Sequence, residues 1–468
     1  MKKLLLIIIT SQFNCLGQDK VLITKYPKTI SIKSDSFQLY YSTWKNNITT
    51  NKVEEDTLDM GNDAIKNAQY FLIYDQDTLK LKYENFPFEQ KFFIPIEMNG
   101  RKFVQSLRIN QVPAYFSQDY IVKNDGKVNF EIPEVYELAN IIWTLSEHGQ
   151  KADNLNKNSK YYENVYSYFK PFLKHRVFKE LDSNIHNYAD SYYDFRENSL
   201  VFVFNQNKII RSEPYFYVMG HDWENYTSLF QKLIPQIEDF AKISQFKKFY
   251  KQNDSYYQKS INKQSELMPV KKMWSWLENN FDNKFNSYKV VYSPLIGATH
   301  STQQYATFLE NGKGSFKETV MFVNGPEIFE DSQTKDSKLQ EGLASGFVFT
   351  EIDHNYINRL SYKYQKQIKS IFDKREIWTG KDGDTERYSD AMAVFNEYMT
   401  HAVFCLYIKD NYDEKEAKYI IEKRESLMVD RRKYIKFKEF TQKLMALRED
   451  KKVKDLYYGI LEWANAVK

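Results

Sequence analysis

The stretch "FVFTEIDHNYIN", from Phe347 to Asn358, decides how the C-terminal third of this 468-residue chain is interpreted. An α-helix advances about 100° per residue, so side chains three or four positions apart share one face. The apolar face of this helix would comprise Val348, Phe349, Ile352 and Tyr356. Glu351 and His354 lie together on the opposite side. The spacing therefore predicts a helix that presents a carboxylate and an imidazole to one place.

A second stretch, "SDAMAVFNEYMTHAVFCLYI" from Ser389 to Ile408, places Glu397 and His401 one helical turn apart. Their neighbours on the same stripe are apolar and comprise Ala393, Val394, Phe404 and Ile408. A carboxylate in apolar surroundings costs free energy unless it is paired or binds a metal. Two interpretations follow. Glu397 and His401 satisfy each other, or Glu397 reaches the same site as His354.

The order of these elements resembles a known class of enzymes. A predicted hairpin from Tyr305 to Val323 precedes the E-x-x-H helix, and an Asn396-Glu397 pair follows on a later helix. This order resembles the gluzincin branch of the zincin metallopeptidases. The segments "IPEVYELANIIWTLSEHG" and "YYENVYSYFKPFLKH" resemble the DUF4932 family of exported bacterial proteins. Together the similarities extend over roughly residues 130–407.

The resemblance implies roles for the residues that match the motif. Glu351 would be the general base that deprotonates a zinc-bound water, and His354 and Glu397 would be zinc ligands. Asn396 would orient its neighbours. The polar side chains expected beside the ligands are Thr350, Asn355, Asn358 and Asn396.

The departure from the zincin pattern is Thr350, which stands where His-Glu-x-x-His has its first histidine. A catalytic zinc normally has three protein ligands and a water. His300, just before the hairpin, or His401 could supply the third ligand. Otherwise the metal has been lost and the fold survives as a binding module or inactive relative, or the match is accidental.

The remaining segments predict an α+β fold. Strand-like alternation extends from about Val21 to Asn129, and helical spacing begins at Pro133. A strand-like break interrupts the helices at "SLVFVFNQNKII". The predicted division is a signal peptide at 1–17, a β-rich N-terminal region at 18–130, a mainly helical region at 131–281 and a zincin-like domain at 282–468. In the last part a small sheet would pack on the E-x-x-H helix.

The N-terminus, "MKKLLLIIITSQFNCLGQDK", is typical of an export signal, with two lysines and a short apolar run before small residues. This run is far shorter than the roughly 20 apolar residues of a membrane span. Lipid anchoring at Cys15 is less favoured, because "QFN" is a poor approach to a lipidated cysteine. The sequence therefore predicts a periplasmic or secreted protein without a transmembrane span.

Charge and cysteine usage limit the partners. The formal net charge is +4, and loss of Lys2 and Lys3 with the signal leaves +2, which does not suggest a nucleic-acid partner. Cys405 would then be the only cysteine, so no intramolecular disulfide can form. We expect Cys405 to be buried.

Two functions remain open. The first is an exported zinc-dependent hydrolase, most simply a peptidase, in which Glu351 activates a metal-bound water. It is preferred because buried Glu397 and His401 need partners. The alternative is a metal-free, catalytically inactive envelope protein that retains the cleft to bind a peptide or glycan.

Overall fold

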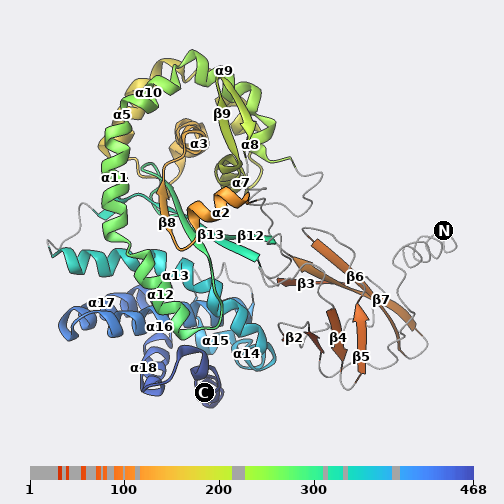
Figure 1. Ribbon diagram of the computed structural model, residues 1–468. Helices are drawn as coiled ribbons and strands as arrows, with labels where there is room; N and C mark the ends of the chain where they lie inside the picture. The colour runs from red at the N-terminus through yellow and green to blue at the C-terminus, as the bar shows by residue number, and fades with distance from the viewer. Residues whose placement is uncertain are drawn as a thin grey trace.

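The computed structural model describes residues 116–212, 227–308, 315–329, 336–381 and 390–467, and the backbone of strands between residues 30 and 110. The fold is α+β and mostly helical, as predicted, with a four-stranded mixed sheet and a hairpin in the N-terminal half (Figure 1). The N-terminal strands are β1 (Ile30–Lys33), β2 (Gln38–Tyr41), β3 (Glu54–Asp59), β4 (Tyr70–Tyr74), β5 (Asp77–Leu81), β6 (Glu89–Met98) and β7 (Arg101–Asn110). The predicted β-rich region stays a prediction, because most residues around these strands, and the predicted signal peptide, lie outside the described part.

The four-stranded sheet has the order β12-β13-β11-β8. Its strands are β8 (Val128–Glu131), β11 (Ser287–Ser293), β12 (Ser301–Phe308) and β13 (Ser315–Asn324). β8 and β13 are parallel to β11, and β12 is antiparallel to β13, so the predicted hairpin pairing is confirmed, with Tyr305 opposite Glu318. Every residue of β11 is buried, as expected for a parallel strand covered on both faces.

The middle of the chain is helical. Its helices are α2 (Gln118–Asn124), α3 (Glu134–Leu145), α4 (Glu147–Lys151), α5 (Lys160–Phe169), α6 (Arg176–Ser183), α7 (Tyr188–Arg196), α8 (Leu229–Lys232), α9 (Ile234–Ile243), α10 (Phe246–Gln252), α11 (Asp254–Leu267) and α12 (Val270–Asn280), with the 3-10 turns η2 (Lys170–Phe172) and η3 (Glu197–Val201). The predicted strand-like break is the hairpin of β9 (Phe202–Asn205) and β10 (Lys208–Arg211), whose turn places Gln206 at a φ of 54°.

The C-terminal part is a second helical group. It contains α13 (Ser337–Lys363), α14 (Gln365–Phe372), α15 (Arg375–Trp378), α16 (Ala391–Asn411), α17 (Glu414–Ser426), α18 (Phe437–Arg448) and α19 (Tyr457–Ala466), with the short helical turns η4 (Pro326–Phe329), η6 (Leu427–Arg431) and η7 (Val453–Leu456). In Figure 1 the sheet lies between these helices and most of those of the middle segment, whereas α12 lies beside α13. The side chains of Asp336 and Asp390 cap α13 and α16, which fixes where both helices begin.

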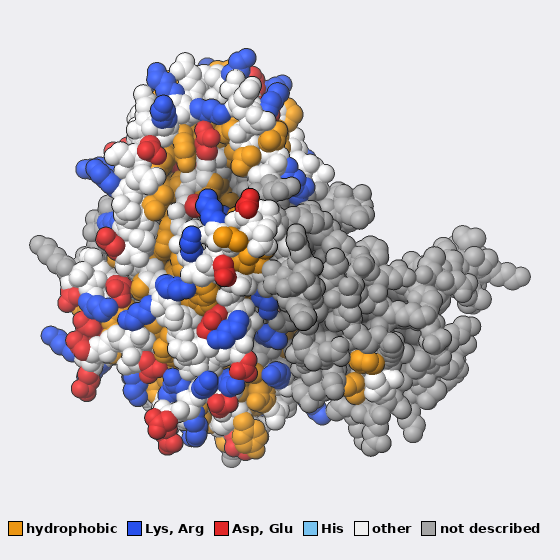
Figure 2. Space-filling model, viewed as in Figure 1, with side chains coloured by type: hydrophobic (Ala, Val, Ile, Leu, Met, Phe, Trp, Pro, Cys, Tyr) orange, Lys and Arg blue, Asp and Glu red, His pale blue; other side chains and the backbone are white. Residues whose placement is uncertain are grey.

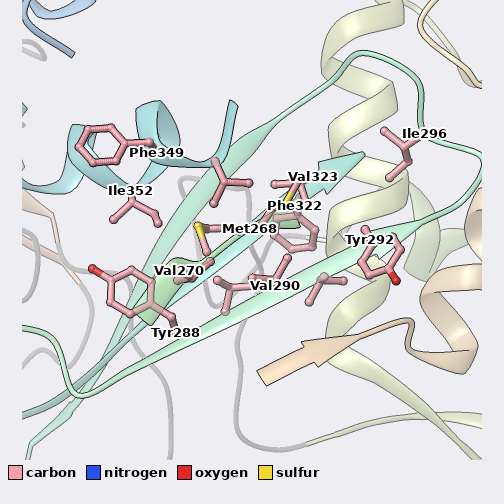
Figure 3. Packing of buried hydrophobic residues seen from close by; sticks show 14 of the residues in the cluster. Met268, Val270, Tyr288, Val290, Tyr292, Ile296, Phe322, Val323, Phe349 and Ile352 are labelled. Atoms are coloured by element: carbon pink, nitrogen blue, oxygen red, sulfur yellow. The ribbon is translucent and has the colours of Figure 1, made fainter. Parts of the chain in front are cut away.

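The predicted apolar face of α13 packs in the core. Val348, Phe349, Ile352 and Tyr356 are all buried. Figure 3 shows Ile352 on the side of α13 that faces the sheet. The ring of Phe349 packs on Phe404 and Tyr407 of α16. The hydroxyl of Tyr356 lies 2.9 Å from that of Tyr288 on β11. The helix is thus held against the sheet by apolar packing and by a buried hydroxyl pair.

Two glycines let α13 approach α17 closely. A Cβ at Gly342 would overlap Ile420, and a Cβ at Gly346 would overlap the guanidinium of Arg424. Side chains of α17 therefore pack directly on the backbone of α13, and the Arg424 guanidinium is one of them.

The sheet takes β8 from residues 128–131, across the predicted boundary at residue 131, and its other strands from the segment after residue 281. The predicted domain boundaries therefore stay predictions.

Cys405 is buried, as expected. Within the described ranges, each helix is too short or too polar to cross a membrane. Figure 2 shows basic and acidic side chains interspersed over the visible described face.

We expect Ile352→Ala to destabilise the protein by about 2–5 kcal/mol, because it removes a fully buried side chain and leaves a cavity. Urea unfolding followed by circular dichroism measures the change. The control is Ile243→Ala at an exposed position of α9, which should change stability by about 0.5 kcal/mol or less. Equal losses in the two variants would contradict the packing of α13.

Candidate functional site

The carboxylate of Glu397 on α16 lies at the centre of a buried polar cluster, and its residue is only 6% exposed. Its Oε1 atom is 3.4 Å from Nε2 of His354 on α13. Its Oε2 atom is 2.8 Å from Nη2 of Arg432 and 3.5 Å from Nε2 of His401. The structure therefore brings Glu397, His354 and His401 together, and it adds an arginine that the sequence analysis did not identify.

His354 carries a positive charge in this cluster. Burial alone would lower its pKa, but Glu397, Glu351 and Asp353 raise the pKa of His354 to about 10. Its Nδ1 atom lies 3.2 Å from Oδ1 of Asn358, a donor-to-acceptor contact that fits a doubly protonated ring. Asn358 thus orients the imidazole toward Glu397.

Glu397 is ionised. Burial alone would raise its pKa, but hydrogen bonds from His354 and His401, with the charges of His354 and Arg432, hold the pKa of Glu397 well below its ordinary value. A carboxylate this deeply buried is retained only because positive groups surround it.

His401 lies between two arginines. Burial, with the charges of Arg432 and Arg424, lowers the pKa of His401 to about 3, so the ring is neutral. Nη1 of Arg432 is 2.5 Å from Nε2, and Nη1 of Arg424 is 3.1 Å from Nδ1. A neutral imidazole has one acceptor nitrogen, so His401 accepts a hydrogen bond from only one of the two arginines.

Arg432 directly follows the π-helical turn η6 and reaches the site from there. Such turns insert an extra residue into a helix and are frequent at functional sites. The backbone N–H of Arg432 donates to the carbonyl of Leu427, five residues earlier, and Lys433 then takes a φ of 63°. This local geometry ends the helix and turns Arg432 toward α16.

Arg424 on α17 lines a hollow of about 170 Å³ between α13, α16 and α17. The hollow is lined by Gly342, Leu343, Phe347, Phe404, Ile420, Lys423, Arg424 and Leu427. The guanidinium carbon of Arg424 is 4.6 Å from the centroid of the Phe404 ring. The wall is thus apolar, with a buried cation on one side.

Glu351 lies at the edge of the cluster. Burial and the charge of Glu397 raise the pKa of Glu351 to about 6, against the opposing charges of His354 and Arg432. A further acid, Glu197 in η3, has its pKa raised to about 7 by burial and by Glu351, and it accepts a hydrogen bond from Ser301. Glu197 has no counterpart in the sequence analysis.

For the other predicted residues, the structure shows contacts with groups other than the Glu397 carboxylate. The Thr350 hydroxyl donates to backbone carbonyls of its own helix. Asn355 accepts a 2.5 Å hydrogen bond from Gln304 on β12. The backbone carbonyl of Asn396 accepts from Thr400. The ring of His300 packs 5.3 Å from that of Phe347, and burial lowers the pKa of His300 to about 4.

These residues do not fit a zinc ion with three protein ligands. The 3.4 Å between His354 and Glu397 is about the separation of two atoms bound at roughly 2.0–2.1 Å to one tetrahedral zinc. However, His401 faces two arginines, and Arg432 already supplies positive charge to the second oxygen of Glu397. Within the described residues no group of three or more His, Cys, Asp or Glu side chains is arranged to hold a metal.

No family model, curated protein or solved structure matches the chain. The resemblance to exported zincin-like proteins therefore stays a proposal.

We expect Glu397→Gln to destabilise the protein by about 3–5 kcal/mol, because it leaves buried positive groups without their carboxylate. His354 has a raised pKa, so its stabilisation is complete below pH 6.5 and is lost as the pH rises through about 10. Glu397 has a lowered pKa, so its stabilisation is present above about pH 4.5 and is lost in more acidic solution. The difference from wild type should be largest between these limits, as measured by urea unfolding across pH.

NMR titration supplies a second readout. In Glu397→Gln the pKa of His354 should fall from about 10 toward the ordinary value of about 6.5. The control is Glu439→Gln, which removes an exposed partner of Lys436 and should cost about 1 kcal/mol or less. An unchanged His354 pKa in Glu397→Gln would show that the two groups are not paired.

Proposed function

We propose that this chain is an exported, metal-free binding protein of zincin-like descent that holds a peptide by a carboxylate and an adjacent apolar side chain. The observation that carries the proposal is the hollow beside Arg424. An engineered cavity of about 150 Å³ accommodates benzene, so a hollow of about 170 Å³ has room for one phenyl or branched aliphatic group.

Arg424 gives this hollow its preference for charge. Its residue is 6% exposed, and among the described residues its one hydrogen-bond partner is His401. The charge of Asp353 acts on Arg424, but neither carboxyl oxygen of Asp353 accepts a hydrogen bond from the guanidinium. The planar guanidinium carries five N–H donors that suit a carboxylate bidentately. A carboxylate ligand would therefore give Arg424 a hydrogen-bonded acidic partner, which it does not have among the described residues.

A peptide fits better than a neutral glycan. A peptide ending in an apolar residue offers a carboxylate and an apolar group a few bonds apart, which matches Arg424 and the apolar wall. Lys423 at the hollow adds a second positive charge. A neutral sugar offers neither group.

Hydrolysis is the second candidate function. The raised pKa of Glu351, about 6, suits a general base near neutral pH. The His354 and Glu397 pair would have to hold zinc, whose chemistry is to activate water. The contact of Arg432 with Glu397 opposes this function, because it places a fixed cation beside the same carboxylate.

Binding of Gly-Gly-Phe tests the proposal. We expect the free acid to bind, and its C-terminal amide to bind at least about tenfold more weakly, because a charged hydrogen bond contributes roughly 1.5–3 kcal/mol. Isothermal titration calorimetry on the full chain measures both. Arg424→Gln should weaken the free acid to the level of the amide.

The matched control is Arg431→Gln, which makes the same substitution at an exposed position in η6. It should bind both peptides as wild type does. The proposal would be contradicted if wild type bound the acid and the amide with equal affinity, or if both arginine variants lost the same affinity for the free acid.

Elemental analysis separates binding from hydrolysis. Protein purified without a His tag from zinc-supplemented medium should contain no stoichiometric zinc, since a third ligand is lacking among the described residues. Glu351→Gln should bind Gly-Gly-Phe with nearly wild-type affinity. One zinc per chain, with peptide cleavage that Glu351→Gln abolishes, would instead establish the hydrolase.

A further inference from the structure

A second group of buried polar atoms lies on the sheet, at the carboxyl ends of β11 and β13. Ser293 and Asn324 end these parallel strands and are partners in their register. The helices α3 and α11 and the turn η4 bring further side chains to the same place, namely Glu137, Ser260, Gln264 and Glu327. The carboxyl ends of parallel strands are the common position of ligand sites in α/β sheets.

Four side-chain oxygens here are buried without a hydrogen-bond donor among the described residues. They are Oε2 of Glu137, Oε1 of Gln264, Oδ1 of Asn324 and Oε2 of Glu327. Glu137, Gln264 and Asn324 have no exposed surface. Buried oxygens of this kind are rare in folded proteins, and each one calls for a partner. All four can only accept hydrogen bonds or coordinate a cation, unless a carboxyl group is protonated.

Hydrogen bonds fix the two amides close together. Nε2 of Gln264 donates to the backbone carbonyl of Asn324 at 2.8 Å, and Nδ2 of Asn324 donates to the carbonyl of Gly325 at 3.1 Å. Both amide nitrogens are thereby engaged, which leaves the two amide oxygens as the atoms in need of partners.

Glu327 is held next to these amides. Its Oε1 atom accepts hydrogen bonds from Ser260, one turn before Gln264 on α11, and from Tyr256. Its Oε2 atom lies so close to Gly325 that a Cβ there would overlap it. Both hydrogen-bond donors therefore bind Oε1 of Glu327, and Oε2 lies against the backbone of Gly325.

Glu137 approaches from α3. Tyr161 donates to its Oε1 atom at 2.7 Å, and the hydroxyl of Ser293 lies against the carboxyl group. The ring of Tyr161 stacks on that of Tyr256, the donor to Glu327, with 5.0 Å between the ring centroids. The two carboxyl groups therefore accept hydrogen bonds from a pair of stacked tyrosines.

We propose that Glu137, Gln264, Asn324 and Glu327 form a buried calcium site that ties α3 and α11 to the ends of β11 and β13. Calcium is coordinated by oxygen atoms, including those of carboxylates and side-chain amides, and it tolerates a flexible coordination geometry. Two carboxylates balance its double charge, and the two amide oxygens add neutral ligands.

Titration of the full chain with calcium tests the site. Protein freed of divalent ions by a chelator is titrated with CaCl₂ by calorimetry, and in parallel with MgCl₂. We expect one calcium per chain, bound more tightly than magnesium, which demands stricter octahedral geometry. Glu137→Gln and Glu327→Gln should each weaken calcium binding by at least about tenfold, because each removes a charged ligand.

The matched control is Asp353→Asn, which neutralises another buried acid whose oxygens have no hydrogen-bond partner in the described part of the chain. Asp353 lies on α13, outside the cluster, so its variant should bind calcium as wild type does. Gly325→Ala should weaken binding without removing a ligand, because it displaces the Glu327 carboxylate.

Absence of saturable calcium binding by wild type, or binding that both glutamate variants retain, would overturn the site and leave buried water as the partner of these oxygens. Tighter binding of magnesium would overturn the assignment to calcium. If the glutamate variants do not fold, the wild-type titration and the Gly325→Ala variant still decide the matter.

Discussion

The cluster depends on compensation of the buried carboxylate of Glu397. Removing a carboxylate from water costs several kcal/mol unless positive groups and hydrogen bonds replace its hydration. Here His354 comes from α13, His401 from α16 itself and Arg432 from the end of the turn η6, as its C-cap residue. The same carboxylate therefore joins three elements, and the relative position of α13 and α16 follows from where these groups can meet it.

The helix α13 contacts three neighbouring parts of the structure. Its apolar face packs toward the sheet, its two glycines admit α17, and its polar face supplies His354. Because Gly346 has no side chain, the Arg424 guanidinium can lie against the helix and beside His401. The hollow and the charged cluster are therefore adjacent, because His401 contacts both Arg424 at the hollow and Arg432 in the cluster.

The sequence predicted α13 and α16 well because their signals are local. Periodicity identified the face of Ile352, and an acid in an apolar stripe marked Glu397 as a residue that needs partners. The arginines were missed for a physical reason. Arg424 and Arg432 follow in a charged segment, where arginines are usually exposed, and nothing local shows that one lies against a glycine and the other after a π turn.

His300 shows that sequence can also suggest a ligand that the fold places in other contacts. As a histidine near the hairpin it was a reasonable candidate ligand, but the fold sets its ring against Phe347. The oxygen cluster on the sheet was likewise invisible in the sequence, since its members come from α3, α11, β13 and η4. Residue type can be read from a sequence, whereas convergence from separate elements depends on the folded topology.

The pairing of β8 with β11 has a consequence for how the chain folds. Val128 faces Tyr288, and every helix from α3 to α12 lies between these two strands in the sequence. Closing so large a loop costs conformational entropy before the strand pairing returns any stabilisation, and folding rates fall as such non-local contacts increase. The sheet can therefore be completed only late, after β11 and β13 have been synthesised, and until then α3 lacks the strands against which its buried face packs.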